Sequence, residues 1–219
     1  IWEGDYATAI AGAYFAQSSY DIMQAMTCPG HAMILSGSYP AQTGIQINEW
    51  YDTKTRKKIY CADDAEFGLS PRRLKTTTYG DEVKNIYPDS KVFTVSLKDR
   101  SAIFLGGHRA DMAVWYEDKP KEWSTTKYYG EAPKWLEKVN VKLRTKGNLE
   151  EKNFEAAMAG TEATMDLAIT ALTEEKLGQR NISGPDVLGV SLSNHDILGH
   201  KEGPDSPNMK TLTLFEDKQ

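Results

Sequence analysis

The sequence predicts an α/β fold in which helices flank a mainly parallel central sheet. Residues 91–97 (KVFTVSL) and about 186–192 are apolar and rich in β-branched side chains, as buried strands are. Between them, residues 161–178 have the period of a helix. A strand, a crossover helix and a second strand in this order are typical of parallel strands in one sheet.

The helix predicted over residues 161–178 is the best defined element. Its apolar face consists of Leu167, Ala168, Ala171 and Leu172. Gly178 stands where a glycine commonly ends a helix. Nearer the N-terminus, residues 30–36 predict a short helix that Gly37 ends.

Residues 111–135 are rich in Trp and Tyr and predict an irregular or lid-like segment. Its aromatic residues are Trp115, Tyr116, Trp123, Tyr128, Tyr129 and Trp135. Such rings can stack on a sugar or a base, but they more often pack a segment onto a core. We therefore expect structural packing here.

Composition argues against several classes of partner. The 219 residues carry a formal net charge of −5 and no basic stripe, so no nucleic acid is expected as a ligand. No apolar run approaches the roughly 20 residues of a membrane helix, so no membrane span is expected. The spacing of the two cysteines, Cys28 and Cys61, does not show whether they pair. The sequence leaves the oligomeric state open.

Polar clusters follow both predicted strands. SLKDR, residues 96–100, follows the first, and SNHDILGH, residues 193–200, follows the second. Ligands gather at the carboxyl ends of parallel strands, so the two clusters are candidates for one shared site.

The residue types in these clusters suit a metal and an anion. Asp196 and His200 are four residues apart, and a carboxylate with an imidazole can ligate zinc. The alternative is a polar loop without a metal. Lys98 and Arg100 are two apart, so in an extended segment they point the same way and can hold a phosphate. The alternative is a solvated charge cluster balanced by Asp99.

A third segment, MTCPGHAMILSGSYPAQTG at residues 26–44, offers two nucleophiles. The Thr27 hydroxyl near a helix start becomes a nucleophile if a metal lowers its pKa, or it is simply an N-cap. Cys28 beside His31 is the rival, as a thiolate next to an imidazole. These residues alone do not decide between them.

Taken together, the segments resemble the type I phosphodiesterase and nucleotide pyrophosphatase branch of the alkaline phosphatase superfamily. The first segment matches the nucleophile region at Thr27, Gly30-His31, Ser36-Gly37, Tyr39-Pro40, Gly44-Ile45, Asn48 and Tyr51-Asp52. SLKDRSAIFLGGHRADMAVWYE looks like the segment that marks phosphate-irrepressible bacterial alkaline phosphatases. PDVLGVSLSNHDILGHKEGPDS resembles the metal-binding Asp-x-x-Gly-His element of the branch.

The resemblance implies roles for individual residues. Thr27 would be the nucleophile and a zinc ligand, and Asn48 would donate a hydrogen bond to a phosphoryl oxygen. Two cations, Lys98 and Arg100, would contact the other phosphoryl oxygens. Two further zinc ligands would be Asp196 and His200. His31 would be structural and Cys28 a bystander, and His108 and His195 do not fit the metal motifs.

The resemblance also implies a function and a setting. We expect zinc-dependent hydrolysis of small-molecule phosphate monoesters through a phospho-threonine intermediate, in the periplasm or outside the cell. The alternatives are a phosphodiesterase or nucleotide pyrophosphatase of the same branch, and a non-catalytic binding protein that kept the fold. Residues 1–219 would form a single alkaline phosphatase-like domain, with crown or lid elements within about 53–160. Two zinc ions need more ligands than this chain offers, so we expect it to be a piece of a longer polypeptide.

Overall fold

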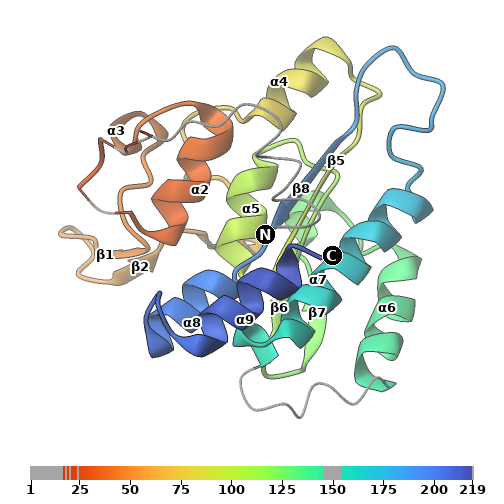
Figure 1. The fold of residues 1–219 in the computed structure, drawn as a ribbon. Helices are drawn as coiled ribbons and strands as arrows, with labels where there is room; N and C mark the ends of the chain where they lie inside the picture. The colour runs from red at the N-terminus through yellow and green to blue at the C-terminus, as the bar shows by residue number, and fades with distance from the viewer. Residues whose placement is uncertain (1–16, 18, 20, 24, 146–153, 219) are drawn as a thin grey trace.

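A four-stranded sheet forms the centre of the molecule (Figure 1). The computed structural model describes residues 17, 19, 21–23, 25–145 and 154–218. The sheet has the order β7-β6-β5-β8 and consists of β5 (Val92–Ser96), β6 (Met112–Glu117), β7 (Glu122–Ser124) and β8 (Val187–Ser191). β5 pairs in parallel with β6 and with β8, whereas β7 pairs antiparallel with β6. The predicted α/β fold with a mainly parallel sheet is confirmed.

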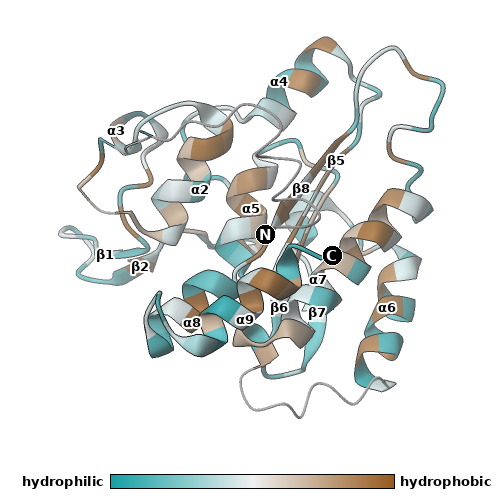
Figure 2. Cartoon of the chain, viewed as in Figure 1, coloured by the Kyte–Doolittle hydropathy of each residue, from teal (hydrophilic) through white to brown (hydrophobic). Residues whose placement is uncertain are grey.

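Helices cover both faces of this sheet. The helices α6 (Lys134–Thr145) and α7 (Met158–Glu174) lie on one face, and α5 (Asp99–Gly106), with α2 (Thr27–Ser36) packed on it, lies on the other (Figure 1). Successive side chains of β6 enter different cores: Val114 packs with the α6 and α7 side, and Trp115 with the α2 and α5 side. Hydropathy colouring is accordingly brown along β5 (Figure 2).

Shorter elements surround the sheet. Two small hairpins are formed by β1 (Glu49–Tyr51) with β2 (Lys58–Tyr60) and by β3 (Asp63–Asp64) with β4 (Gly68–Leu69). The remaining helical elements are α3 (Pro40–Thr43), α4 (Tyr79–Ile86), η1 (Lys127–Tyr129), η3 (Phe154–Ala156), α8 (Asn194–Glu202) and α9 (Pro207–Glu216). Among the described residues, no helix combines the length and apolarity needed to cross a membrane.

Both predicted strands are confirmed, and both predicted helices exist with different ends. α2 begins at Thr27 rather than at residue 30, because Pro29 fits in a first turn, where backbone N–H groups have no partner within the helix. Gly37 ends this helix with φ +63°, as predicted. α7 ends at Glu174, and Gly178 has φ +70° in the turn that follows, so it is not the C-cap.

The prediction of an irregular segment over residues 111–135 is wrong. This stretch contains β6, a central strand of the sheet, and then β7 and η1. Both faces of β6 are covered, so its sequence lacks the polar alternation of a half-exposed strand. Structural packing of the aromatic residues is confirmed for Trp115, Tyr116, Trp123 and Trp135, which are all buried. The single-domain organisation and the crown elements within 53–160 stay predictions.

Candidate active site

A cleft of about 240 Å³ lies at the carboxyl ends of β5 and β8. Thr27, Lys98 and Asp196 all line it, although they are remote from one another in the chain. β5 ends at Ser96, just before Lys98, and β8 ends at Ser191, just before the start of α8. The structure therefore brings together the two polar clusters and the threonine that sequence analysis selected.

Thr27 is the first residue of α2. The N-cap of this helix is Met26, which makes no side-chain capping hydrogen bond, so the N-cap interpretation of Thr27 is wrong. Cys28, the next residue, forms a disulfide with Cys61. A sulfur held in a disulfide is not a thiolate, so the bridge removes the rival nucleophile while it is intact.

His31 joins α2 to the end of β8. Its Nδ1 lies 2.9 Å from the backbone oxygen of Thr27, and its Nε2 lies 2.9 Å from the Ser191 hydroxyl. Burial lowers the pKa of His31, and the nearby cations Lys98 and Arg100 lower it further, against the backbone hydrogen bond. These contacts fit the structural role expected of His31, which stays a prediction.

Asn48 accepts hydrogen bonds from the backbones of both cysteines of the disulfide. Its Oδ1 accepts a hydrogen bond from the Cys28 N–H at 2.8 Å, and its backbone oxygen accepts one from the Cys61 N–H at 2.9 Å. The first of these satisfies an N–H at the open end of α2. The side-chain NH₂ remains as the donor, which is the property that the predicted role requires.

The two predicted phosphate-binding cations have different surroundings. Lys98 forms an ion pair with Asp196, and its side chain is 13% exposed. Arg100 is not among the residues that line the cleft, and it lies in the first turn of α5. The expected extended segment therefore ends at Lys98. Arg100 also pairs with Asp99, as the charge-cluster alternative expected, with Nη1 and Oδ1 3.6 Å apart.

Asp196 and His200 lie one turn apart on α8, as their spacing predicted. Oδ1 of Asp196 is 3.4 Å from Nε2 of His200. Burial would raise the pKa of Asp196, but the hydrogen bond and charge of Lys98 outweigh it and lower the pKa. A carboxylate and an imidazole fit zinc as donors, yet the described part of the chain holds no group of three or more His, Cys, Asp or Glu suited to a metal. The two side chains fit as part of a ligand set.

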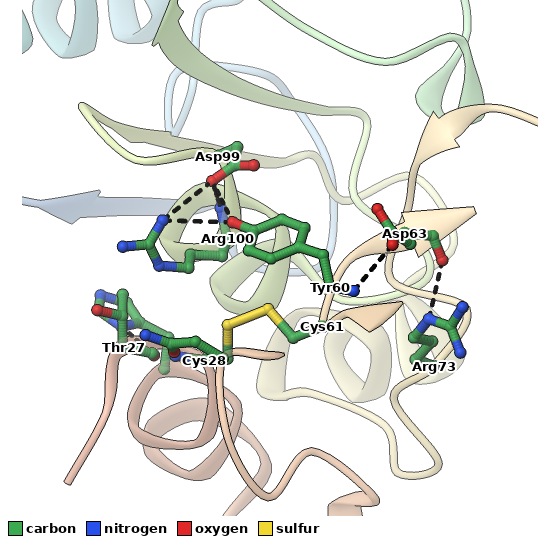
Figure 3. Close-up of a disulfide and its surroundings, with 10 residues drawn as sticks. Thr27, Cys28, Tyr60, Cys61, Asp63, Arg73, Asp99 and Arg100 are labelled. Atoms are coloured by element: carbon green, nitrogen blue, oxygen red, sulfur yellow. Dashed lines mark hydrogen bonds and ion pairs between the residues drawn. A yellow bond between two sulfur atoms is a disulfide. The ribbon is translucent and has the colours of Figure 1, made fainter. Parts of the chain in front are cut away.

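Sequence analysis did not identify Tyr60 as a partner of the site, and it named Asp99 only as a balancing charge. The Tyr60 hydroxyl contacts both Asp99 and Arg100 (Figure 3). The proximity of Tyr60 to Cys61 was the only available signal, and it required knowledge of the disulfide. His195 is also accounted for, because its Nδ1 pairs with Glu216 at 2.7 Å and links α8 to α9.

Comparison with known proteins relates this chain to a family. The sequence profile described as type I phosphodiesterase / nucleotide pyrophosphatase matches residues 11–218. Alkaline phosphatase PhoD of Zymomonas mobilis is 31% identical over 84% of this chain, which corresponds to 39% of that protein. Alkaline phosphatase PafA of Elizabethkingia meningoseptica is 27% identical over 99% of this chain and 50% of its own length.

A solved structure agrees with this similarity. The crystal structure of wild-type alkaline phosphatase PafA superposes with a TM-score of 0.82 at 26% identity, covering 90% of this chain and 49% of that one. The chain thus spans half or less of the length of these relatives.

Proposed function

Because the chain belongs to the type I phosphodiesterase/nucleotide pyrophosphatase family, we propose that it carries the nucleophile and phosphoryl-binding half of a phosphate monoesterase. The observation that carries the proposal is the single cleft that holds Thr27, Lys98 and Asp196. The alkaline phosphatases among its relatives support the same reaction class.

Thr27 is the proposed nucleophile. Its oxygen attacks phosphorus and the bond between phosphorus and the leaving oxygen breaks, which leaves phospho-threonine. The threonine proton goes to solvent, and the leaving oxygen takes up a proton to become the alcohol. Water then attacks phosphorus and releases inorganic phosphate, which restores the hydroxyl. Such a displacement needs positioned charge more than further covalent chemistry.

Three side chains supply that charge and a hydrogen bond. Lys98 and Arg100 neutralise phosphoryl oxygens, and the Asn48 NH₂ donates to another. Two cations favour a monoester, because its terminal phosphoryl group carries more negative charge than that of a diester. The ion pair between Lys98 and Asp196 orients the lysine at the edge of the cleft.

Zinc is the proposed cofactor, and Thr27, Asp196 and His200 would hold it with ligands from the rest of the polypeptide. When bound, the metal lowers the pKa of an attached hydroxyl group and neutralises developing charge. Metal analysis of the complete protein separates an enzyme from a binding protein that kept the fold. About two zinc ions per chain support the enzyme, and none supports the binding protein.

The first test replaces the nucleophile in the complete protein. Thr27→Ala is expected to lower the turnover of nitrophenyl phosphate by roughly a thousandfold or more, because the attacking oxygen is gone. The matched control is a Cys28→Ala, Cys61→Ala double variant, which removes the neighbouring sulfur and keeps the hydroxyl. If the double variant is inactive and Thr27→Ala is not, the assignment of the nucleophile is wrong.

The second test distinguishes monoesters from diesters. Wild-type protein is expected to prefer nitrophenyl phosphate to bis-nitrophenyl phosphate. Lys98→Ala and Arg100→Ala are each expected to lower kcat/KM for the monoester by about a hundredfold, and to lower that for the diester less. A strong preference of the wild type for the diester would favour the phosphodiesterase alternative.

We also propose that the protein works in the periplasm or outside the cell. The Cys28–Cys61 disulfide supports this location, since disulfides persist in oxidising compartments and are rare in the cytosol. Labelling of free thiols in protein isolated under denaturing, thiol-trapping conditions tests it. Labelling of both Cys28 and Cys61 would contradict the proposed location.

A further inference from the structure

The Arg100 guanidinium is held from one side by a pair of polar groups (Figure 3). Its Nη1 donates to the Tyr60 hydroxyl at 3.3 Å and lies 3.6 Å from Oδ1 of Asp99. The Tyr60 hydroxyl in turn donates to the same Asp99 oxygen at 2.7 Å. The three side chains thus form a closed triangle of hydrogen bonds and charge.

Arg100 depends on this triangle for its orientation. An arginine has a long, flexible side chain, and fixing it costs up to about 2 kcal/mol of conformational entropy. Within the described residues, its guanidinium has no other hydrogen-bond or ion-pair partner, and its buried Nε has none. Asp99 is itself fixed, because its Oδ1 also accepts from the Arg100 backbone N–H at 2.6 Å.

Tyr60 is anchored independently of Arg100. Its backbone N–H donates to Asp63 at 2.8 Å, and its partly buried ring packs against the core beside α2 and α5. The following residue, Cys61, is bonded to Cys28, which is adjacent to Thr27. The disulfide therefore links the segment that carries the Tyr60 hydroxyl to the first turn of α2, which carries Thr27.

The Tyr60 hydroxyl keeps its proton. Burial, and then the adjacent carboxylate of Asp99, raise the pKa of Tyr60 well above its ordinary value. A protonated hydroxyl donates to Asp99 and accepts from Arg100 at the same time, which is the arrangement observed.

We propose that Tyr60 is a positioning residue whose hydroxyl, together with Asp99, aims the Arg100 guanidinium at the phosphoryl group. The inference rests on the proposed function, because it requires Arg100 to meet the substrate. The Tyr60 hydroxyl donates to Asp99 and accepts from Arg100, so it acts through Arg100 and not on the substrate. Asp99 thereby helps to orient the Arg100 guanidinium as well as balancing its charge.

The test is a double-mutant cycle in the complete protein. Tyr60→Phe keeps the ring and removes the hydroxyl, and it is expected to lower kcat/KM for nitrophenyl phosphate roughly tenfold. In an Arg100→Ala background the same change is expected to have no further effect, because nothing remains to be aimed. Tyr79→Phe is the matched control, since Tyr79 is 54% exposed on α4, and it should leave kcat/KM unchanged.

Each outcome decides the inference. Equal losses from Tyr60→Phe with and without Arg100 would show a structural effect and overturn it, as would wild-type activity of Tyr60→Phe. If Arg100→Ala lowers kcat/KM and Tyr60→Phe does not, only the role of Tyr60 is overturned. An Arg100→Ala variant with wild-type activity overturns the proposed role of Arg100 and this inference with it.

A second variant guards against misfolding of the first. Asp99→Asn keeps the size of the side chain and removes the negative charge that pairs with Arg100. It is expected to reduce kcat/KM for the monoester severalfold in the wild type and not in Arg100→Ala. Additive losses in this cycle would contradict the inference.

Discussion

Opening the Cys28–Cys61 disulfide is expected to lower the free energy of unfolding by about 3–4 kcal/mol. The bridged residues are 33 positions apart. The conformational entropy that closing a loop of this length removes from the unfolded chain corresponds to about 3.7 kcal/mol at 25 °C. Both cysteines are 0% exposed, so replacing them by alanine also removes packed sulfur and costs somewhat more than reduction does.

Urea unfolding of the complete protein measures this effect. Three samples are compared: oxidised wild type, wild type refolded under a phosphine reductant, and the Cys28→Ala, Cys61→Ala variant. Refolding under reductant is needed because buried sulfurs are shielded in the folded protein. The variant controls for any action of the reductant on a bound metal. Coincident unfolding curves for the oxidised and reduced wild type would refute the reasoning, because the disulfide would then add nothing to the free energy of unfolding.

Two further predictions concern stability. Burial would raise the pKa of Asp186, but two backbone N–H donors and Arg180 lower it overall. The ionised carboxylate therefore stabilises the fold at pH values above the unfolded-state pKa of about 3.9. This stabilisation is lost as the pH falls through the lower pKa of the folded state. Asp186→Asn should therefore cost about 2 kcal/mol at pH 7 and progressively less as the pH falls below about 3.9. A deficit in the urea midpoint that stays constant as the pH is lowered would contradict this. Gly107→Ala should lower the free energy of unfolding by about 3 kcal/mol, because Gly107 has φ +73° and an added Cβ would lie 2.3 Å from Oγ1 of Thr78. An unchanged thermal midpoint would contradict this prediction.

The sequence by itself determined the elements that have a local pattern. β5, β8 and α7 are visible because burial and backbone preference leave a periodic or apolar composition within a few residues. The strand ends then located the two polar clusters, since topology places the carboxyl ends of parallel strands at one edge. The segment that contains Thr27 was identified from the order of its residues alone.

Tertiary structure decided what depends on the rest of the chain. β6 was missed because its Trp and Tyr residues suggested an irregular segment, and only the packing shows that its two faces are buried as those of β5 are. The pairing of Cys28 with Cys61 depends on a hairpin that brings distant residues together, and spacing does not encode that.

The contacts of the site cross still longer distances. Lys98 meets Asp196 across 98 residues, and Arg100 meets Tyr60 across 40. Local sequence sets which backbone conformation and degree of burial each segment favours. Which side chains then touch is fixed only when the helices pack on the sheet, because that packing depends on all of the segments at once.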